Sequence, residues 1–586
     1  MKNNFSSDLT RFKFQKKIGA YTGLILILLF SLIPLTDLFH PGLPLTHDGQ
    51  DHVARIANFY QSFSEGNFIP RWAANLNWGY GHPILMFLYP LPSYASSLFH
   101  FIGFSLTDSL KIVFGLSFIL SGLAMYLWVR NFLGEASALI AGVFYIFAPY
   151  RFVDLYVRGA IGEHTAFIFP PLLLYFLLKL FKVKSSNSHE QYFYSIGIAF
   201  SLAGFILSHN AISLMFLPFI FFYVLYLSLD KKIKTNSSLI KSQLSRLDVN
   251  YLIKSLSFLA FGFLISSYFW VPAFFEGKYT LRDIVTKGEY ANHFVNAPRL
   301  FSSVWSYGGS QDLSVQIGII HLIGTVLSVF LAIKLFHKSK KIFMLYILSL
   351  MYLLISLVLM LDQSIIIWQK VTILQKFQFP WRLLSVVVFM SSFLAAIAFY
   401  VIENKKMKKI ILIIFLASVI IFNKDYWRAN DYLYLSDSFF KSIYNGTTDT
   451  GESGPKWSVR FMEKRPNSRI EIIEGSGNIK EIFRGSTDHR YIIESPVDSA
   501  RVRENTLYFP GWAVFVDGKP VNVEFQDPRH RGLITFYVDK GKHLVEIIFA
   551  ETKLRQASNI LSLISFITIL VYGAHVFSLK RQKKTK

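Results

Sequence analysis

Apolar segments long enough to cross a lipid bilayer, separated by short basic loops, most strongly constrain how this chain can fold. About twelve of them, most near the ~20 residues that a membrane-spanning helix needs, recur along the sequence. They cover residues 18–38, 110–129, 137–150, 165–181, 192–207, 211–229, 256–274, 315–336, 342–361, 381–402, 410–422 and 557–577. Because 52% of the 586 residues are hydrophobic, an ordinary soluble core cannot hide this apolar surface. The sequence therefore predicts a polytopic α-helical membrane protein.

The distribution of positive charge predicts the orientation of the chain. The formal net charge is +23, but the basic residues lie mostly in short loops between the apolar segments. This pattern follows the positive-inside rule and is not that of a nucleic-acid-binding patch. It places the N-terminus (residues 1–17) and the C-terminal tail (578–586) in the cytoplasm of a plasma-membrane protein. The first apolar segment lacks a small-residue cleavage site, so we expect it to stay as an uncleaved helix.

The sequence divides into three regions. Residues 1–423 form the predicted transmembrane domain, which includes a first external loop at 39–108. Within this loop we expect residues 84–102 to be interfacial or re-entrant, because Pro90 and Pro92 break the apolar run. Residues 424–556 alternate apolar and polar side chains and carry turn sequences at 475–478, 517–518 and 539–541, which predicts an extracytoplasmic all-β, sandwich-like domain. Residues 557–586 form the final helix and the basic tail.

A polar stretch directly after the first apolar segment is the first candidate site. Asp48, His52 and Arg55 recur at i, i+4 and i+7, and Asp51 precedes Arg55 by four residues, so on a helix these groups share one face. Apolar residues recur on another face, as in a helix lying along a membrane surface: Val53, Ile56, Tyr60 and Phe63. The alternative is a capped surface helix without chemistry, in which Asp48 is the N-cap and Asp51 lies near position N3.

Several arginines on the predicted outer side are exceptions to the positive-inside rule. They are Arg55, Arg71, Arg151, Arg158 and Arg382, and they are accompanied at outer helix ends by Glu163, His209 and Gln378. A guanidinium group binds phosphate through two parallel hydrogen bonds, and a nearby carboxylate can act as a general base or bind a divalent ion. The structural alternatives are snorkelling to lipid phosphates for Arg151, an Arg158–Glu163 pair that only fixes the loop, and an ordinary helix-end histidine at position 209.

The order of these motifs resembles that of known membrane proteins. Asp48 and Asp51 in the first external loop, followed later by the loop Arg158–Glu163, are similar to the GT-C superfamily of integral-membrane glycosyltransferases. The second loop has Arg-x-x-x-x-Glu where some relatives have an acidic pair. The whole chain most closely resembles the bacterial membrane proteins called "6-pyruvoyl-tetrahydropterin synthase-related" and their YfhO-like cousins. The motifs that carry this resemblance are His47-Asp48, Asp51-His52, Pro70–Trp72, Arg158-Gly159, Gly162-Glu163, Ser208–Asn210, Gln378–Arg382, Phe509–Trp512, Val516–Lys519 and Gly541–His543.

The resemblance implies transfer of a sugar from a polyprenyl-phosphate donor to a cell-envelope acceptor outside the cytoplasm. Asp48 or Asp51 would deprotonate or orient the acceptor hydroxyl, while Arg158, Arg71 or Arg382 would hold the leaving lipid phosphate. The remaining predicted substrate-binding residues are His52, Arg55, Glu163, His209 and Gln378. The pterin-synthase name does not imply that enzyme's chemistry, since the soluble enzyme uses a histidine-ligated zinc and this sequence shows no comparable triplet. No cofactor follows from the residues, and a divalent metal ion is left open.

Two other functions stay open at this point. A lipid or polysaccharide transporter would carry ionisable residues near the middle of its spans, whereas here the mid-span regions are nearly free of charge. A non-catalytic envelope-assembly protein would keep the scaffold and present the β domain. The chain has no cysteine, which excludes disulfides, cysteine-ligated zinc and a cysteine nucleophile. The predicted partners are the bilayer, a polyprenyl-phosphate-linked sugar and an envelope glycan, and not nucleic acid.

Overall fold

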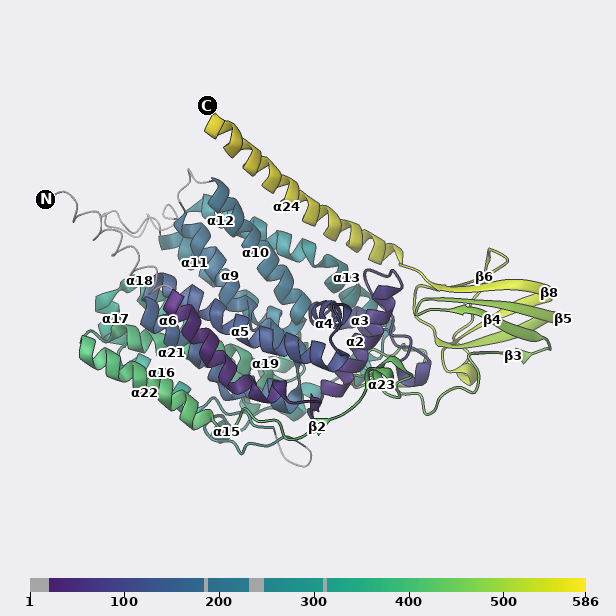
Figure 1. The fold of residues 1–586 in the computed structure, drawn as a ribbon, viewed down its shortest axis with the longest axis horizontal. Helices are drawn as coiled ribbons and strands as arrows, with labels where there is room; N and C mark the ends of the chain where they lie inside the picture. Colours follow the sequence, from purple (N-terminus) through teal and green to yellow (C-terminus); the bar gives the residue numbers. More distant parts are fainter. Residues whose placement is uncertain (1–20, 184–187, 231–246, 309–312, 586) are drawn as a thin grey trace.

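A computed structural model describes residues 21–183, 188–230, 247–308 and 313–585. It shows a long bundle of helices with a β domain at one end (Figure 1). The predicted cytoplasmic N-terminus, residues 1–17, lies outside the described residues. The polytopic helical fold with a β domain before the last helix is confirmed.

Eight described helices are long and apolar enough to span a membrane, and there are up to eleven if each of three bent helix pairs is one span. The eight are Tyr21–Phe39, Leu106–Leu133, Ile161–Lys182, His189–Ser208, Asn210–Leu229, Lys340–Met360, Pro380–Val401 and Lys553–Ala574. The bent pairs are Glu135–Phe147 with Pro149–Arg158 (46°), Val249–Ile265 with Ser267–Tyr279 (67°) and Ile319–Phe330 with Ala332–Lys338 (59°). These match all but one of the predicted segments. The exception, 410–422, lies in a helix whose first turns are rich in lysine, Lys405–Asn423.

The helices of the described residues form a longer and a shorter group. The longer ones are α2 (Gly49–Ser64), α4 (Leu91–Phe101), α5 (Leu106–Leu133), α6 (Glu135–Phe147), α9 (Phe169–Lys182), α10 (Ser188–Ser208), α11 (Asn210–Asp230), α12 (Val249–Ile265), α13 (Ser267–Phe275), α16 (Ile319–Phe330), α17 (Ala332–Lys338), α18 (Lys340–Met360), α21 (Leu384–Val401), α22 (Lys405–Asn423) and α24 (Lys553–Thr585). The short ones are α3 (Ile84–Phe87), α7 (Pro149–Phe152), α8 (Ile161–Ala166), α14 (Arg282–Val285), α15 (Ala297–Phe301), α19 (Ile365–Lys370), α20 (Thr372–Gln375) and α23 (Asp437–Lys441). The stretch 84–102 thus forms two helices separated at Leu88–Pro90, and each is too short to span.

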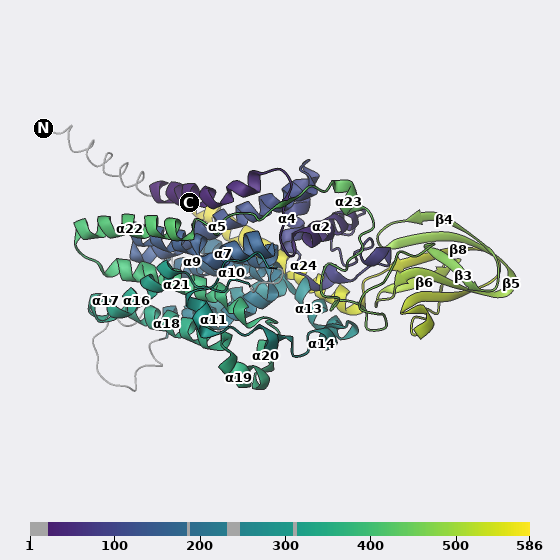
Figure 2. The same cartoon turned by 90° about the horizontal axis from the view of Figure 1, so that it is seen from below.

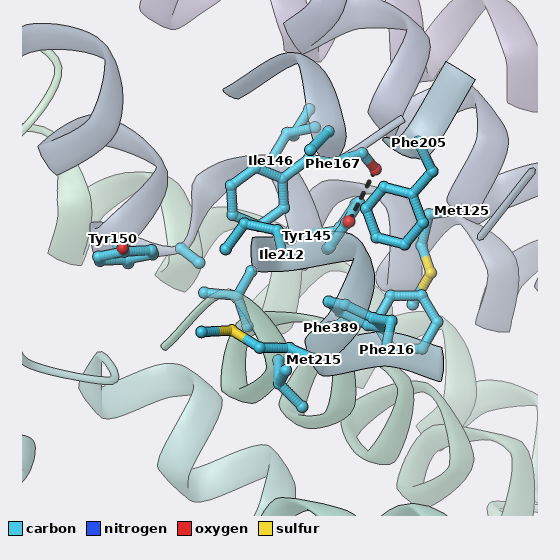
Figure 3. Close-up of a cluster of buried hydrophobic side chains, with 14 of the residues drawn as sticks. Met125, Tyr145, Ile146, Tyr150, Phe167, Phe205, Ile212, Met215, Phe216 and Phe389 are labelled. Carbon is cyan, nitrogen blue, oxygen red and sulfur yellow. Dashed lines mark hydrogen bonds between the residues drawn. The ribbon is translucent and has the colours of Figure 1, made fainter. Parts of the chain in front are cut away.

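Helix α21 lies at the centre of the bundle because it is apolar on every face and 94% of its span is buried. It packs against α6, α16 and α18. Figure 3 shows Phe389 of α21 packed between rings of neighbouring helices, with Tyr145 at 5.8 Å and Phe216 at 5.6 Å between centroids. The hydroxyl of Tyr145 donates to the carbonyl of Phe167 (2.8 Å), so this polar group of the aromatic cluster is satisfied.

The β domain is one curved sheet. Its strands are β3 (Ile470–Glu474), β4 (Asn478–Arg484), β5 (Asp488–Leu507), β6 (Trp512–Val516), β7 (Lys519–Val521) and β8 (Leu533–Phe549). The order β3-β5-β8-β6-β7, with β4 also paired to β5, makes a six-stranded antiparallel sheet. The all-β prediction is confirmed, but the described strands form a half-barrel instead of the two facing sheets of a sandwich.

The predicted turns of the β domain have different outcomes. Residues 517–518 join β6 to β7, with Val514 paired to Val521, and 475–478 connect β3 to β4. The turn predicted at 539–541 is wrong, because these residues lie inside β8. There the pairing with β5 shifts register, because Ser495 pairs with Gly541 and Ser499 with Asp539, so the extra residues of this bulge lie in β5, opposite the predicted turn.

Several connections hold the β domain, and the segment that precedes it, to the bundle. Strand β1 (Leu43–Pro44) pairs with β2 (Tyr432–Leu433), and Figures 1 and 2 place α23 beside α2. After the sheet, α24 runs from the β domain back toward the opposite end of the bundle (Figure 1). At its start Arg555 forms a buried ion pair with Glu276 (Nε–Oε2, 2.8 Å).

We expect Arg555→Ala to destabilise the protein strongly, because it leaves the carboxylate of Glu276 buried without its charge partner. The expected cost is about 3–5 kcal/mol of the free energy of unfolding. Thermal unfolding in detergent measures the change. The matched control is Arg490→Ala, which removes an exposed pair with Asp488 and should leave the unfolding temperature unchanged. Equal losses in both variants would contradict the assignment.

Candidate functional site

Helix α2 is part of the protein core. Its apolar face packs against α4 and α5, with Val53 and Ile56 buried. Asp48 does occupy the N-cap position, yet its side chain makes no capping hydrogen bond. The hydroxyl of Thr46 accepts from the amide of Gly49 instead (3.1 Å). The alternative interpretation, an exposed helix capped by the Asp48 side chain, is therefore wrong, and the Asp48 carboxylate is available for another role.

A cluster of buried charges lies where the bent span Glu135–Arg158 meets α8. Arg158 donates through Nη1 to Asp154 (2.6 Å) and to Glu163 (2.9 Å), and its guanidinium lies 4.7 Å from the ring centroid of Trp381. The hydroxyl of Tyr150 donates to the other oxygen of Glu163 (2.6 Å). The ion pair foreseen as the structural alternative therefore forms, but within a larger network.

Arg382 joins this cluster from a distant part of the sequence. Its Nε lies 3.4 Å from Glu163, and its Nη1 donates to the carbonyl of Phe377 (2.9 Å). Two arginines thus share one carboxylate, and all three side chains are buried. The turn before Arg382 holds Gln378 in a left-handed conformation (φ 67°), an uncommon one for a residue other than glycine. Strain of this kind concentrates at functional sites.

Local sequence explains how this geometry arises. A wide helical turn over Val153–Arg158 places Asp154 and Arg158 on one face and stops at Gly159, whose φ is +67°. Helix α8 then begins within three residues and returns Glu163 toward Arg158. Gly159 allows the chain to change direction here, because glycine adopts the left-handed conformation at little cost.

The first external loop contacts the same cluster through its backbone. The amide of His47 donates to the carbonyl of Val157 (3.0 Å), and that of Asp48 donates to the carbonyl of Arg158 (2.8 Å). A methyl group added at Gly159 would lie 2.3 Å from the Thr46 hydroxyl. The acidic loop and the Arg158–Glu163 loop are therefore in direct contact, as a composite site requires.

His209 completes this side of the site. Its ring is buried and stacks on Tyr89, with 5.0 Å between centroids. The ring of Tyr89 also lies against Gly162, where a methyl group would have no room. His209 is thus enclosed next to the charged cluster and is not exposed at a helix end.

The polar face of α2 contacts residues that follow α23. Asp51 accepts from the hydroxyl of Tyr444 (2.7 Å), and Arg55 donates to the hydroxyl of Thr448 (2.9 Å) and to Nδ1 of His52 (3.0 Å). Burial, and next the positive charges of Arg55 and Arg158, lower the pKa of His52 well below its ordinary value. The neutral ring can therefore accept the bond from Arg55.

The ionisation of Asp51 is affected by several neighbours. Burial is the largest effect and raises the pKa of Asp51 above its ordinary value. The hydrogen bond from Tyr444 and the charge of Arg55 act in the opposite direction, whereas the carboxylates of Asp48 and Asp449 add to the increase. A carboxylate with a raised pKa is a stronger base.

Two predicted residues are not brought into the cluster. Arg71 donates to Glu551 (2.7 Å), to Asn559 (2.9 Å) and to the carbonyl of Tyr268 (3.1 Å), so it joins the first loop to α13 and α24. Arg151 does not snorkel to the surface. It is fully buried, donates to Ser121 (3.0 Å) and lies 4.0 Å from the ring centroid of Phe167.

Sequence reasoning missed a group of residues that complete the site: His82, Tyr150, Asp154, Tyr444, Thr448 and Asp449. Asp154 could have been found, because it precedes Arg158 by one helical turn. Asp449, by contrast, pairs with His82, which lies 367 residues away, and no local pattern signals such a contact (Nε2–Oδ1, 3.3 Å). Burial opposes the ionisation of Asp449, but the contact with His82 and bonds from Ser453 and Gly451 outweigh it and hold its pKa well below the usual range.

The site shows no preformed metal centre. In the part of the chain that the structure describes, no group of three or more histidine, cysteine, aspartate or glutamate side chains is arranged to hold a metal ion.

Comparison with known families shows the relationship. The model of a membrane-protein family described as "6-pyruvoyl-tetrahydropterin synthase related domain" matches residues 85–429. The chain belongs to this family. The resemblance noted in the sequence is thereby confirmed. The 6-pyruvoyl-tetrahydropterin synthase-related segment includes Arg158, Glu163 and Arg382, whereas Asp48 and Asp51 precede it.

The individual proteins that resemble this chain share little sequence identity with it. A Lactococcus lactis protein (subsp. cremoris, strain MG1363) described as uncharacterized is 27% identical over 224 residues, or 37% of this chain, and the match spans about a third (35%) of that relative. Similar solved structures include arabinofuranosyltransferase AftD from Mycobacteria (12% identity, TM-score 0.46, covering 69% of this chain and 27% of AftD). A second is oligosaccharyltransferase AglB from Archaeoglobus fulgidus, in complex with an inhibitory peptide and a dolichol-phosphate (15% identity, TM-score 0.39, covering 73% of this chain and 56% of AglB). A third is ArnT from Cupriavidus metallidurans bound to undecaprenyl phosphate (12% identity, TM-score 0.37, covering 70% of this chain and 63% of ArnT). Scores below 0.5 do not establish a common fold, so the GT-C expectation rests on the residues of this chain.

The close approach of the two loops can be tested at Gly159. We expect Gly159→Ala to lower the unfolding temperature, because the methyl group would collide with Thr46 and the left-handed backbone is strained for alanine by about 1–2 kcal/mol. Gly288→Ala is the control, since its φ is similar (+74°) and no atom lies within 4 Å of the added methyl group. Thermal unfolding should show the larger loss at position 159, and equal losses would mean that the loops do not press together.

Proposed function

We propose that this protein is a GT-C-type membrane glycosyltransferase. It transfers a sugar from a polyprenyl-phosphate donor to a cell-envelope acceptor on the outer face of the plasma membrane. The observation that carries this proposal is the direct contact between the Asp48 loop and the buried Arg158–Glu163–Arg382 cluster. Such a site offers both a base for an acceptor hydroxyl and cations for a departing phosphate.

The arginines supply the phosphate-binding half. Negative charge develops on the lipid phosphate as the bond to the sugar breaks, and cations fixed in advance in a buried site stabilise that charge selectively. Arg158 and Arg382 are held by Glu163, so both are oriented before substrate arrives. Arg71 is less suited to this role, because its guanidinium already bonds to Glu551, Asn559 and Tyr268.

The acids supply the other half. Asp48 is half-buried and lies one hydrogen bond from the backbone of Arg158, while Asp51 lies on the first turn of the same helix. In an inverting transfer one of them takes the proton of the acceptor hydroxyl as its oxygen attacks the anomeric carbon, and the lipid phosphate leaves with the bonding electrons. Burial raises the pKa of Asp51, which suits its carboxylate to accept a proton.

The positions of the charges favour an enzyme over a transporter. The three bent helix pairs are a feature that a transporter would share. However, Arg158, Glu163 and Arg382 lie within a few residues of the ends of their spans, and His209 lies between two spans. Charges gathered at one end of the bundle suit chemistry at a membrane face better than passage through the middle.

We expect Asp51→Asn to reduce sugar transfer by about 10²–10⁴-fold, the usual contribution of a general base. Purified protein in detergent, supplied with synthetic polyprenyl-phosphate sugars and envelope glycan acceptors, provides the measurement. Asp48→Asn tests the alternative base in the same assay. Asp283→Asn, an exposed carboxylate on α14, is the control and should retain full activity. Full activity in both Asp48→Asn and Asp51→Asn would exclude these residues as the base.

The phosphate-binding role is tested with Arg382→Lys. Lysine keeps the charge but cannot form the planar fork, so we expect kcat to fall by about 10²–10³-fold. Arg428→Lys, at an exposed pair with Asp37, is the matched control. Unchanged kcat in Arg382→Lys, with the unfolding temperature also unchanged, would remove Arg382 from the proposed site.

A further inference from the structure

A segment far along the chain covers the polar face of α2. Residues 444–453, which we name the strap, follow α23 and precede the β domain. Loops usually lie exposed on the surface, yet in the strap Thr447, Thr448 and Ser453 are each at most 5% exposed. The strap therefore belongs to the packed interior next to the candidate site.

The backbone of the strap is fixed by the first external loop. The amide of Tyr444 donates to the carbonyl of Asn75 (2.8 Å), and its carbonyl accepts from the amide of Trp78 (2.9 Å). The amide of Asn77 donates to the carbonyl of Gly446 (2.8 Å). These backbone bonds do not depend on the Tyr444 side chain, so its ring is held at α2 whether or not the hydroxyl has a partner.

The strap also holds Arg55 at the cost of backbone strain. Thr448 has a φ of +67°, a conformation that a β-branched residue rarely adopts. In it, both the hydroxyl and the carbonyl of Thr448 accept hydrogen bonds from Arg55. Since such strain is costly and concentrates at functional sites, it is a second, independent sign that the strap is part of the site.

We propose that the strap is a component of the active site and that Tyr444 is a positioning residue for Asp51. This inference rests on the proposed function, in which Asp51 acts as the base. Tyr444 fixes one oxygen of the carboxylate by a 2.7 Å hydrogen bond, so the other oxygen is presented to the acceptor hydroxyl.

The hydrogen bond has an electrostatic consequence as well. The charged and titratable groups that face Asp51 are Arg55 and Asp48 at the start of α2, and Tyr444 and Asp449 on the strap. Burial and the charge of Asp51 raise the pKa of Tyr444, so its hydroxyl stays protonated and donates. A donor stabilises the ionised carboxylate, and its removal must therefore raise the pKa of Asp51 further.

The test is the pH profile of Tyr444→Phe. If Asp51 must be ionised to act, kcat/KM falls as the pH drops through its pKa. Loss of a hydrogen bond to a charged group, worth about 1.5 kcal/mol or more, should shift this acidic limb upward by about one pH unit. Tyr432→Phe is the control, because it removes a hydroxyl bond to a backbone carbonyl (Asp37) in the same connecting region and should leave the limb in place. A merely structural role for Tyr444 would lower activity at all pH values without shifting the limb.

A second readout separates this inference from the proposed function. Infrared titration of the purified protein follows the protonated carboxyl band that disappears in Asp51→Asn, and it needs no turnover. Its midpoint should move upward in Tyr444→Phe and stay fixed in Tyr432→Phe. An unmoved midpoint in Tyr444→Phe overturns the role of the strap even if transfer is observed. A shifted midpoint in a protein whose Asp51→Asn variant keeps full transfer supports the contact but removes Asp51 as the base.

Discussion

The structure depends on one buried group of charges. Arg158 lies between Asp154 and Glu163, and Glu163 also faces Arg382. An unpaired charge inside a helical bundle is very costly, so each of these side chains requires its partner. These ion pairs join the end of one bent span, the start of the next span and the start of the span that contains α21. The geometry of the site is therefore a consequence of charge compensation among helices.

The fold could be predicted where one local property decides it. Apolar length identified the spans, and Pro90 and Pro92 identified the break between α3 and α4, because both effects act within one segment. The number of β sheets could not be predicted. A Gly-containing sequence such as 539–541 suits a turn as well as a strand, and here it continues β8 because it pairs with β5 across a bulge in that strand.

The residues of the site could be predicted only in part, because the sequence shows charged residues but not their distant partners. Sequence reasoning named Asp48, Arg158, Glu163 and Arg382, which the structure does gather, because the predicted topology put all four on one side of the bundle. It also named Arg71, which pairs with Glu551 480 residues away. A pattern of charges gives the side of the membrane on which a residue lies, but the partner of each charge depends on packing between distant segments.

The long separation between Arg55 and Thr448 has a consequence for biogenesis. The two residues are 393 positions apart, so a ribosome that adds about 5–20 residues per second needs roughly 20–80 s between them. During that interval the first helices enter the membrane while α2 still lacks the cover of the strap. The contact between α2 and the strap therefore forms only after almost all of the spans have been made, and a truncated chain that ends before residue 444 would lack the cover of the polar face of α2.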